Sequence, residues 1–418
     1  MLLVAFQSAV SIGDSYFVGR LGTRPLAGLA LVFPLVMLLQ MTSSGAMGGG
    51  ISSAVARALG SGDAPTARRL TVHALAIALA MGAFFTLVLL PFGRGAYSLL
   101  GGRDESLAHA LAYSNILFGG AIAVWLANTL ANLLRGTGDM LTPALALIGA
   151  AVLQVPLCGA LALGLGPMPR LGIAGSAVAY VGAFSLAGCA MAIAVFKPGS
   201  ALRPRSGDFA LEWRLFREIL RVGALSMVNS AQTVLTALVL TGLVGRFGPA
   251  ALAGYGVGLR LELLQIPLVF AVGQAMVVLV GIHVGARHPL RAKRIAWTGA
   301  ALGAAPSLAI GAAVALAPQL WVGLFSADAA VLEAGARYLR TVGPFYPFLA
   351  AGVALYFTAQ GAGRVIWPLL AGTARLALVI GGGLLAASLQ GIFAAIALAM
   401  LAFGALTLLF TARIIDWT

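Results

Sequence analysis

The sequence predicts an all-α integral membrane protein with twelve transmembrane helices. The helices should form two six-helix bundles related by a pseudo-two-fold axis along the membrane normal.

Three observations support this fold class. Of 418 residues, 61% are hydrophobic and only 9% are charged, compared with roughly 25% charged residues in soluble domains. Apolar runs of about 20 residues, long enough to cross a hydrocarbon core, recur along the whole chain. Short sequence words also repeat at an offset of 225 or 226 residues, which indicates a duplication.

Glycine, proline and charge clusters divide the chain into twelve apolar spans. The expected spans are 1–18, 28–57, 70–92, 112–134, 141–163, 171–196, 222–244, 252–283, 296–318, 339–359, 366–388 and 391–412. Residues 1–196 and 222–418 should therefore form the two bundles, and the basic stretch 197–221 should be a cytoplasmic linker. The apolar segment from Met1 lacks the marks of a cleavable signal. We expect it to be the first transmembrane helix, truncated at its amino-terminal end.

Lysine and arginine are divided unevenly between the loops on the two sides. Sixteen of the 26 lie on one side, six of them in 197–221, and eight lie on the other side; Arg260 and Arg375 fall within spans. Because cytoplasmic loops carry the excess of positive charge, we expect a multi-pass protein of the inner membrane with both termini in the cytoplasm. The net charge of +14 lies in short loops, so it does not indicate nucleic-acid binding.

Four collinear matches carry the duplication. They pair Val18–Gly22 with Val244–Gly248, Leu26–Gly28 with Leu252–Gly254, Leu38–Gln40 with Leu263–Gln265, and Gly136–Gly138 plus Pro143 with Gly361–Gly363 plus Pro368. Each repeat carries an even number of helices, so both have the same orientation and enclose a central cleft. This architecture is typical of transporters that work by alternating access. A duplicated structural membrane protein is the alternative.

Asp14 is the ionisable residue with the strongest functional expectation. It lies about four residues, or roughly 6 Å, inside the outer end of the first span. A carboxylate there costs about 2.5 to 3.5 kcal/mol unless it is protonated, paired or hydrated. Gln7 and Ser11 precede it on the same helical face, so we expect this polar stripe to face the cleft. The alternative is a hydrated carboxylate at the interface, or one paired with Arg20.

The second half carries polar groups of its own. Arg260 and Glu262 lie two residues apart in the eighth span, so their side chains diverge and need separate partners. Arg375 in the eleventh span is a possible partner for Glu262. A structural ion pair and direct binding of a cationic substrate both remain open.

An uncharged polar stripe follows the seventh span. It consists of Ser226, Asn229, Ser230 and Thr233. These side chains either line the cleft or form hydrogen bonds between helices.

The remaining sequence motifs do not indicate a catalytic, metal-binding or channel function. The four histidines have no metal-ligand spacing, no P-loop Lys-Ser/Thr follows the glycine-rich turns, and no cluster of catalytic groups is visible. A channel would need charge rings or filter repeats. Cys158 and Cys189 lie in apolar runs, where free thiols are usually inert. We therefore expect neither an enzyme nor a bound cofactor or metal. The expected partners of this monomer are small amphipathic substrates and the lipid bilayer.

Several segments resemble the multidrug and toxic compound extrusion (MATE) family. They are Asp14–Gly22, Leu134–Asp139, Gly172–Ala177, Arg260–Glu262 and Gly281–Ala286, followed by Arg291 and Arg294. The resemblance covers essentially the whole chain. It implies an antiporter, driven by a sodium or proton gradient, that exports organic cations and other amphipathic drugs.

The resemblance also implies roles for single residues. The family places an essential acid for ion coupling at the position of Asp14. Some members surround it with Asn and Asp on the fifth helix, but here the matching positions are Gln154 and Cys158. Tyr180 in the sixth span completes the site that we expect in the first bundle. In the second bundle we expect Asn229, Thr233, Arg260 and Glu262 to line the cleft.

Proton coupling is the expectation for this chain. One acid suffices for a proton, whereas a sodium ion would have to rely on neutral oxygens. Sodium-driven members of another branch use acids in the seventh and tenth helices, where this chain has Thr233 and no acid. The alternatives are a sodium-coupled exporter and a lipid-linked sugar flippase of the same superfamily. The flippase would need more cations for a pyrophosphate than Arg260 and Arg375.

Overall fold

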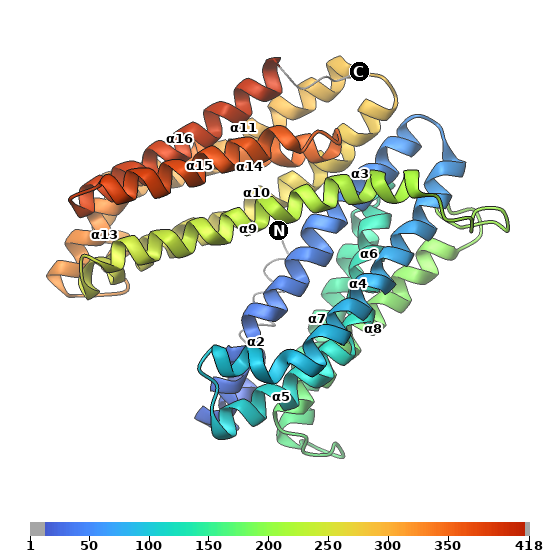
Figure 1. Ribbon diagram of the computed structural model, residues 1–418, viewed down its shortest axis with the longest axis horizontal. Helices are drawn as coiled ribbons and strands as arrows, with labels where there is room; N and C mark the ends of the chain where they lie inside the picture. Colours follow the sequence, from blue (N-terminus) through green and yellow to red (C-terminus); the bar gives the residue numbers. More distant parts are fainter. Residues whose placement is uncertain (1–12, 414–418) are drawn as a thin grey trace. The chain divides into compact units, whose positions relative to one another are not determined.

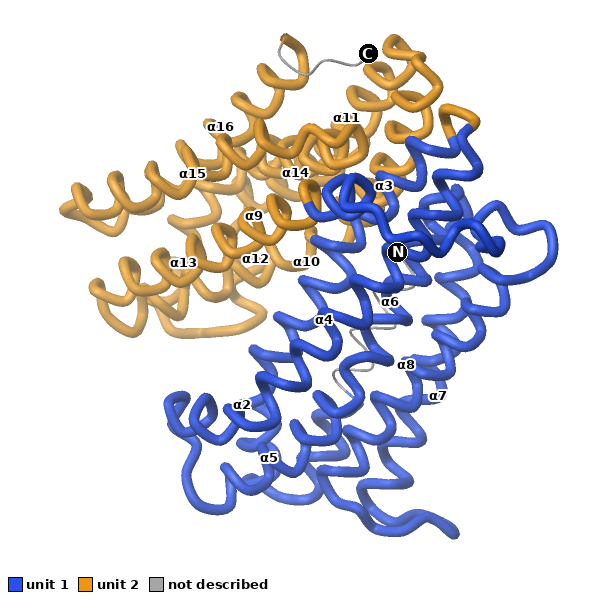
Figure 2. The backbone as a smooth tube through the Cα atoms, turned by 45° about the vertical axis from the view of Figure 1, so that its right-hand side comes forward, with its two compact units in different colours: residues 1–59, 63–220 blue, residues 60–62, 221–418 orange. Residues whose placement is uncertain are grey.

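The computed structural model of the chain describes residues 13–413, and within this range it contains helices, turns and loops but no β-strand (Figure 1). The chain divides into two compact units. Unit 1 comprises residues 1–59 and 63–220, and unit 2 comprises residues 60–62 and 221–418 (Figure 2). The predicted all-α class is confirmed.

Unit 1 begins with a helix that is described over residues 13–19. The helices that follow are α2 (Thr23–Gln40), a π-helix (Met41–Ala46), α3 (Met47–Gly60), α4 (Ala64–Leu99), α5 (Asp104–Gly119), α6 (Ala121–Gly136), α7 (Leu141–Leu163) and α8 (Ile173–Phe196). The Asp63 side chain caps α4 by accepting a hydrogen bond from the Thr66 amide at 3.0 Å, which satisfies one of the free N–H groups of the first turn.

Unit 2 contains most of α9 and all the later helices. Its elements are α9 (Trp213–Gly245), α10 (Pro249–Gly285), α11 (Pro289–Leu316), α12 (Pro318–Val322), α13 (Ala329–Val342), a 3₁₀ turn (Gly343–Phe345), α14 (Tyr346–Gly361), α15 (Ile366–Leu385) and α16 (Leu389–Arg413). Pro249, Pro289 and Pro318 each stand in the first turn of their helix, where the missing N–H costs nothing.

Ten helical stretches of the described residues are long and apolar enough to cross a membrane, or eleven if the bent pair α5 and α6 counts as one span. The multi-pass architecture is confirmed, but the count of twelve is not shown, because most of the predicted span 1–18 lies outside the described residues. Two of the spans predicted as single helices are interrupted. The span 112–134 bends by 49° between α5 and α6, at Gly119 and Gly120. The span 339–359 breaks at the 3₁₀ turn that contains Pro344, a residue that cannot donate a backbone hydrogen bond.

The helices pack in the same pairs in both units. In unit 1, α2 packs on α5, α4 on α6, α6 on α8, and α7 on α8. In unit 2, the corresponding pairs are α10 with α13, α11 with α14, α14 with α16, and α15 with α16. Apart from α8 and α16, each helix of unit 1 in these pairs begins 225 or 226 residues before its counterpart in unit 2, which is the offset that relates the sequence repeats. The duplication therefore extends from short sequence matches to the packing of whole helices.

A close glycine contact recurs at equivalent positions of the two units. A Cβ atom on Gly28 would lie 2.9 Å from the amide nitrogen of Ala110, and one on Gly254 would lie 2.6 Å from that of Gly335. Real Cβ atoms essentially never approach this closely. Glycine at these two positions therefore allows α2 to contact α5, and α10 to contact α13, backbone against backbone.

Residues 197–212, which we call the strap, connect α8 to α9 and are fixed to α4. Arg68 Nε donates to Asp208 Oδ2 at 2.8 Å, and Arg69 Nη1 donates to Glu212 Oε1 at 2.6 Å. The buried His73 ring accepts the Glu212 backbone N–H through Nε2 at 2.8 Å. Its Nδ1 lies 2.7 Å from the Arg69 carbonyl oxygen, which can only accept, so Nδ1 carries the proton. The strap is therefore part of unit 1 rather than a free linker.

The start of α9 also differs from the expected boundary. The sequence predicts a linker up to residue 221, whereas α9 begins at Trp213. Leu215 and Ile219 are fully buried in the core of unit 1. The physical reason is their spacing of four residues, which places both side chains on one helical face.

We expect Gly254→Ala to destabilise the protein by about 1 to 3 kcal/mol, because the added methyl group must displace the Gly335 backbone. Gly256→Ala on the same helix is the matched control, since a Cβ there meets nothing within 4 Å. Thermal unfolding of the two variants in detergent measures the difference. Equal melting temperatures would contradict the close contact.

Candidate functional site

The first helix, described over residues 13–19, packs lengthwise on α7. Gly13 lies against Val155, since a Cβ on Gly13 would be 3.1 Å from the Val155 side chain. The Phe17 ring lies against Gly159, since a Cβ on Gly159 would be 2.8 Å from that ring. Asp14 lies between these two contacts and is only 8% exposed. Apolar contacts before and after Asp14 therefore hold its carboxylate against α7.

The Asp14 carboxylate is only partly satisfied. Gln154 Nε2 donates to its Oδ2 at 2.9 Å. The Cys158 thiol, four residues further along α7, lies next to the carboxylate. Among the described residues, Asp14 Oδ1 has no hydrogen-bond partner. Buried polar atoms are nearly always paired, so this oxygen is suited to hold a proton or a cation.

Two tyrosines lie within electrostatic range of Asp14: Tyr113 on α5 and Tyr180 on α8. Tyr113 is almost completely buried. The Tyr180 hydroxyl accepts a hydrogen bond from Gln40 Nε2 at the end of α2. Polar groups from α2, α5, α7 and α8 therefore surround the acid or connect to its neighbours.

A chain of amides links Tyr180 to the π-helix. Asn128 Nδ2 on α6 donates to Gln40 Oε1 at 3.0 Å and to Ser43 Oγ at 2.8 Å. Ser43 in turn donates to the Leu39 carbonyl oxygen at 2.7 Å. π-Helical segments are often found at functional sites. Here Gln40 and Ser43, three residues apart, both bond the Asn128 amide where α2 passes into the π-helix.

Asp14, Gln154, Cys158 and Tyr180, which the sequence predicts to form one site, all lie in unit 1 with the contacts given above. Gln7 and Ser11 lie outside the described residues. The possible pairing of Asp14 with Arg20 is not observed, because the Arg20 guanidinium lies over the Tyr16 ring, 5.7 Å from its centroid.

Sequence analysis did not find Tyr113, Gln40, Asn128 or Ser43 as part of this site. A signal existed for Asn128, because it and Asn132 stand one turn apart in an apolar span, and such amides rarely face lipid. For Tyr113 the signal was the repeat offset, since Tyr338 lies 225 residues further along the chain.

The corresponding cluster in unit 2 surrounds Glu262 on α10. The Tyr338 hydroxyl donates to Glu262 Oε2 at 3.2 Å. The Tyr338 ring stands edge-on to Tyr255, with centroids 5.4 Å apart. Its close approach to α10 requires Gly258, where a Cβ would lie 2.2 Å from the ring. Each unit therefore has a repeat-related tyrosine near an acid, although the two acids stand on different helices and the hydrogen bond is seen only between Tyr338 and Glu262.

The two arginines expected in this region have aromatic neighbours. The Arg260 guanidinium lies over the Phe325 ring at 5.2 Å, and that of Arg375 over the Phe403 ring at 5.8 Å. Arg375 is close enough to Glu262 to interact through space. Among the described residues, neither Arg260 nor Arg375 forms an ion pair with Glu262.

The polar residues of α9 differ in their contacts. Ser226 Oγ accepts from Gln360 Nε2 on α14 at 2.9 Å, which is a hydrogen bond between helices. Asn229 Oδ1 lies against Gly372 on α15. Thr233 is exposed and bonds only the Asn229 carbonyl oxygen of its own helix, at 3.0 Å. Of the two alternatives for this stripe, hydrogen bonding between helices describes Ser226, while Thr233 remains available to line a cleft.

The model of the family described as MatE matches residues 1–159 and 225–385 of this chain. This match covers most of the sequence and both repeats. The chain belongs to the MatE family. The resemblance drawn from the sequence segments is therefore confirmed, and the protein is a MATE transporter.

Two relatives illustrate the range of this family. The FAD transporter of Shewanella oneidensis is 29% identical over 292 residues, which are 68% of this chain and 63% of that protein. The probable multidrug resistance protein NorM of Deinococcus radiodurans is 29% identical over 377 residues, 85% of this chain and 78% of that protein. The chain thus spans somewhat less than two thirds of the FAD transporter.

Solved structures show the same fold. The crystal structure of MATE in the bent conformation matches with a TM-score of 0.91 and 23% sequence identity, over 99% of this chain and 92% of that chain. An outward-facing multidrug resistance MATE transporter of the MOP superfamily matches with a TM-score of 0.87 and 22% identity, over the same shares of the two chains. At these identities the likeness concerns the fold alone.

We expect Asn128→Leu to loosen the π-helix, because it leaves the Gln40 and Ser43 side chains without their shared donor, at a cost of about 1 to 3 kcal/mol. Hydrogen exchange of residues 40–46 should become faster. Thr129→Val is the matched control, since the buried Thr129 hydroxyl has no partner among the described residues. Unchanged exchange in Asn128→Leu would contradict the structural role of the amide chain.

Proposed function

We propose that this MATE transporter is a proton-coupled antiporter that exports amphipathic, often cationic compounds by alternating access. The proposal rests on the buried carboxylate of Asp14. One of its oxygens accepts a hydrogen bond from Gln154, and the other has no hydrogen-bond partner among the described residues. An acid in a transmembrane segment is a functional site by default, since it is costly to keep there.

The chemistry follows from the two protonation states of Asp14. The ionised carboxylate attracts a cation, and the protonated carboxyl group does not. A proton and a cationic substrate therefore compete for one group. Such competition can bias the inward and outward forms only if the two ligands have different affinities for them. Gln154 orients Oδ2 in both states, because its amide donates equally to a carboxylate and to a carboxyl carbonyl oxygen.

The neighbours of Asp14 favour a proton over a sodium ion. A hard cation prefers several oxygen ligands. The groups beside Asp14 on α7 are the Gln154 amide, which donates to the carboxylate, and the Cys158 thiol, so α7 offers a sodium ion only one neutral oxygen, Oε1 of Gln154. A proton needs only the free carboxylate oxygen. A sodium-coupled exporter remains the alternative, with Gln154, Tyr180 and Gln40 as possible sources of neutral oxygens.

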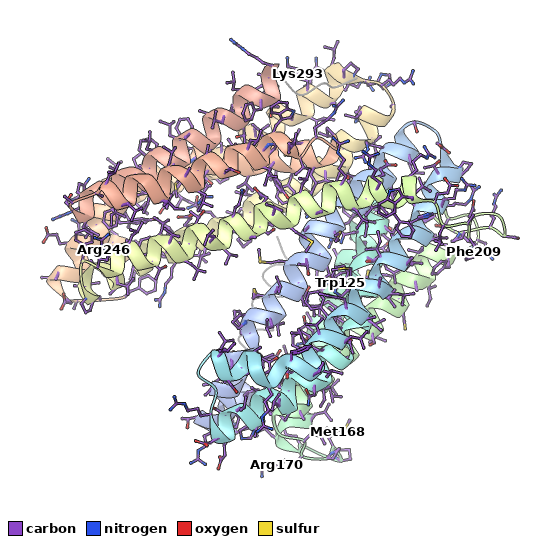
Figure 3. The ribbon with its side chains drawn as sticks, viewed as in Figure 1. Trp125, Met168, Arg170, Phe209, Arg246 and Lys293 are labelled. Carbon is purple, nitrogen blue, oxygen red and sulfur yellow. The ribbon has the colours of Figure 1, made fainter. Side chains whose placement is uncertain are left out.

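We also propose that the protein lies in the inner membrane with both termini in the cytoplasm. In unit 1, the loop with Met168 and Arg170 and the strap with Phe209 lie at opposite ends of α8 (Figure 3). In unit 2, Arg246 and Lys293 lie at opposite ends of α10 (Figure 3). The ends that carry the strap and Lys293 hold the excess of basic residues, which supports a cytoplasmic location.

A second candidate substrate class is an anionic dinucleotide. The Shewanella oneidensis relative is named a FAD transporter. Arg260 and Arg375 in unit 2 face aromatic rings without a carboxylate partner within ion-pair distance, an arrangement that suits a flat anionic ligand. Export of ethidium and of FAD from the same everted vesicles distinguishes the two classes.

We expect Asp14→Asn to reach the membrane at wild-type levels and to lose ethidium export to background, because Asn keeps the shape but is always neutral. Asp104→Asn, which changes an exposed acid of unit 1, should export normally. Wild-type export by Asp14→Asn across about pH 6 to 8 would make Asp14 a structural residue and would direct the search for the coupling acid to Glu262.

We expect Ser206→Cys in the strap to react only with a membrane-permeant thiol reagent in intact cells, and Met168→Cys in the opposite loop of unit 1 to react with an impermeant one. Both positions are exposed. Cys158 and Cys189 are first replaced by serine. The reverse labelling pattern would overturn the proposed orientation.

A further inference from the structure

A hollow of about 490 Å³ lies beneath the strap in unit 1. Its walls include Leu75, Ala76 and Leu79 on α4 and Phe196 at the end of α8, and the strap covers it with Arg203 and Phe209. This volume lies in the range of sites that bind small molecules, about 300 to 1,000 Å³. Phe209 marks the strap at the end of unit 1 (Figure 3).

The part of the strap that lines the hollow is held in a fixed position. The strap is tied to α4 by the Arg68–Asp208 and Arg69–Glu212 ion pairs, at 2.8 and 2.6 Å. The Arg205 backbone N–H and the Arg68 guanidinium lower the pKa of Asp208. A lowered pKa means that the first ion pair persists at neutral pH and is lost only when the pH falls below the ordinary range of an Asp. The hollow is therefore formed before any ligand arrives.

The lining combines apolar walls with one positive charge. Leu79 is 49% exposed and Phe209 is 62% exposed, so both present apolar surface to the outside. Arg203 is exposed and forms no ion pair in the described part of the chain. A free inorganic anion would gain nothing from the leucines and phenylalanines, whereas an apolar ligand would gain nothing from the guanidinium. The complementary ligand has a negatively charged head and a hydrocarbon tail.

The position of the hollow indicates the source of such a ligand. It lies at the end of α8 and against residues 72–79 of α4, and the chain that follows α8 carries six basic residues between Lys197 and Arg221 and the exposed Trp213. Basic residues and tryptophan gather at the membrane interface. Basic pockets between transmembrane helices on the cytoplasmic side bind anionic lipid headgroups.

We propose that this hollow binds one anionic phospholipid of the cytoplasmic leaflet. Its phosphate contacts Arg203, and an acyl chain lies along α4 against Leu75, Leu79 and Phe196. The site is separate from the polar cluster around Asp14, so lipid binding and proton coupling can be tested independently.

Native mass spectrometry of the full chain, released from detergent after incubation with phosphatidylglycerol or phosphatidylcholine, tests the proposal. We expect phosphatidylglycerol to stay bound and phosphatidylcholine to be lost. Arg203→Gln should weaken phosphatidylglycerol binding about tenfold or more, as expected for the loss of a charged hydrogen bond. Arg205→Gln, which removes the same charge from the strap outside the hollow, should have a much smaller effect.

Two further variants test the apolar part. Ala76→Phe fills the hollow and should weaken phosphatidylglycerol binding without changing the charge. Ala80→Phe on the same helix, outside the lining, should leave it unchanged. Equal losses in Arg203→Gln and Arg205→Gln would reduce the effect to diffuse electrostatic attraction. Undiminished binding by a folded Ala76→Phe variant, or displacement of the lipid by inorganic phosphate, would overturn the lipid site.

Discussion

The burial of the Asp14 carboxylate is the constraint on which the arrangement of unit 1 depends. A charge in this environment must be paired, hydrated or neutralised. The first helix and α7 meet through Gly13 with Val155 and Phe17 with Gly159, so apolar contacts hold the acid in place on both sides. Gln154 supplies one hydrogen bond, at 2.9 Å. The other oxygen, Oδ1, has no hydrogen-bond partner among the described residues.

The two units share their helix packing but differ in where their acidic residues lie. Equivalent helix pairs and the glycine contacts at Gly28 and Gly254 keep the scaffold the same. Within it, Tyr113 lies near an acid of the first helix, whereas Tyr338 donates to an acid of α10. After duplication, the scaffold was retained and the position of the acid diverged. Unit 2 also differs in Arg260 and Arg375, whose guanidinium groups lie over aromatic rings.

Much of the fold could be predicted from the sequence because its causes are local. Long apolar runs and basic loops define spans, and the repeat offset defines two bundles. Breaks within spans were missed, since Gly119–Gly120 and Pro344 are common in membrane helices without breaking them. The strap was missed for another reason. Its ion pairs join residues about 140 positions apart, Arg68 with Asp208 and Arg69 with Glu212, and no local pattern reveals such partners.

The candidate site was predictable only in part. The cost of a carboxylate in lipid identified Asp14, and the family resemblance identified Gln154 and Cys158. The amide chain joins Asn128 on α6 to Gln40 and Ser43, which lie 88 and 85 positions earlier in the sequence. Helical periodicity shows which residues share a face of one helix but not which other helix packs against that face, so it could not place these residues together.

Proton release on substrate binding tests the central claim most directly. A cationic probe such as tetraphenylphosphonium is added to the purified protein in weakly buffered detergent solution, and the pH change is followed with an indicator dye. If the cation and the proton compete for Asp14, the wild-type protein releases about one proton for each cation bound in some part of the range from about pH 5 to 8. Sodium is not needed, and Asp14→Asn releases none. Cation binding without proton release at any pH in this range, or equal release by Asp14→Asn, would contradict the account.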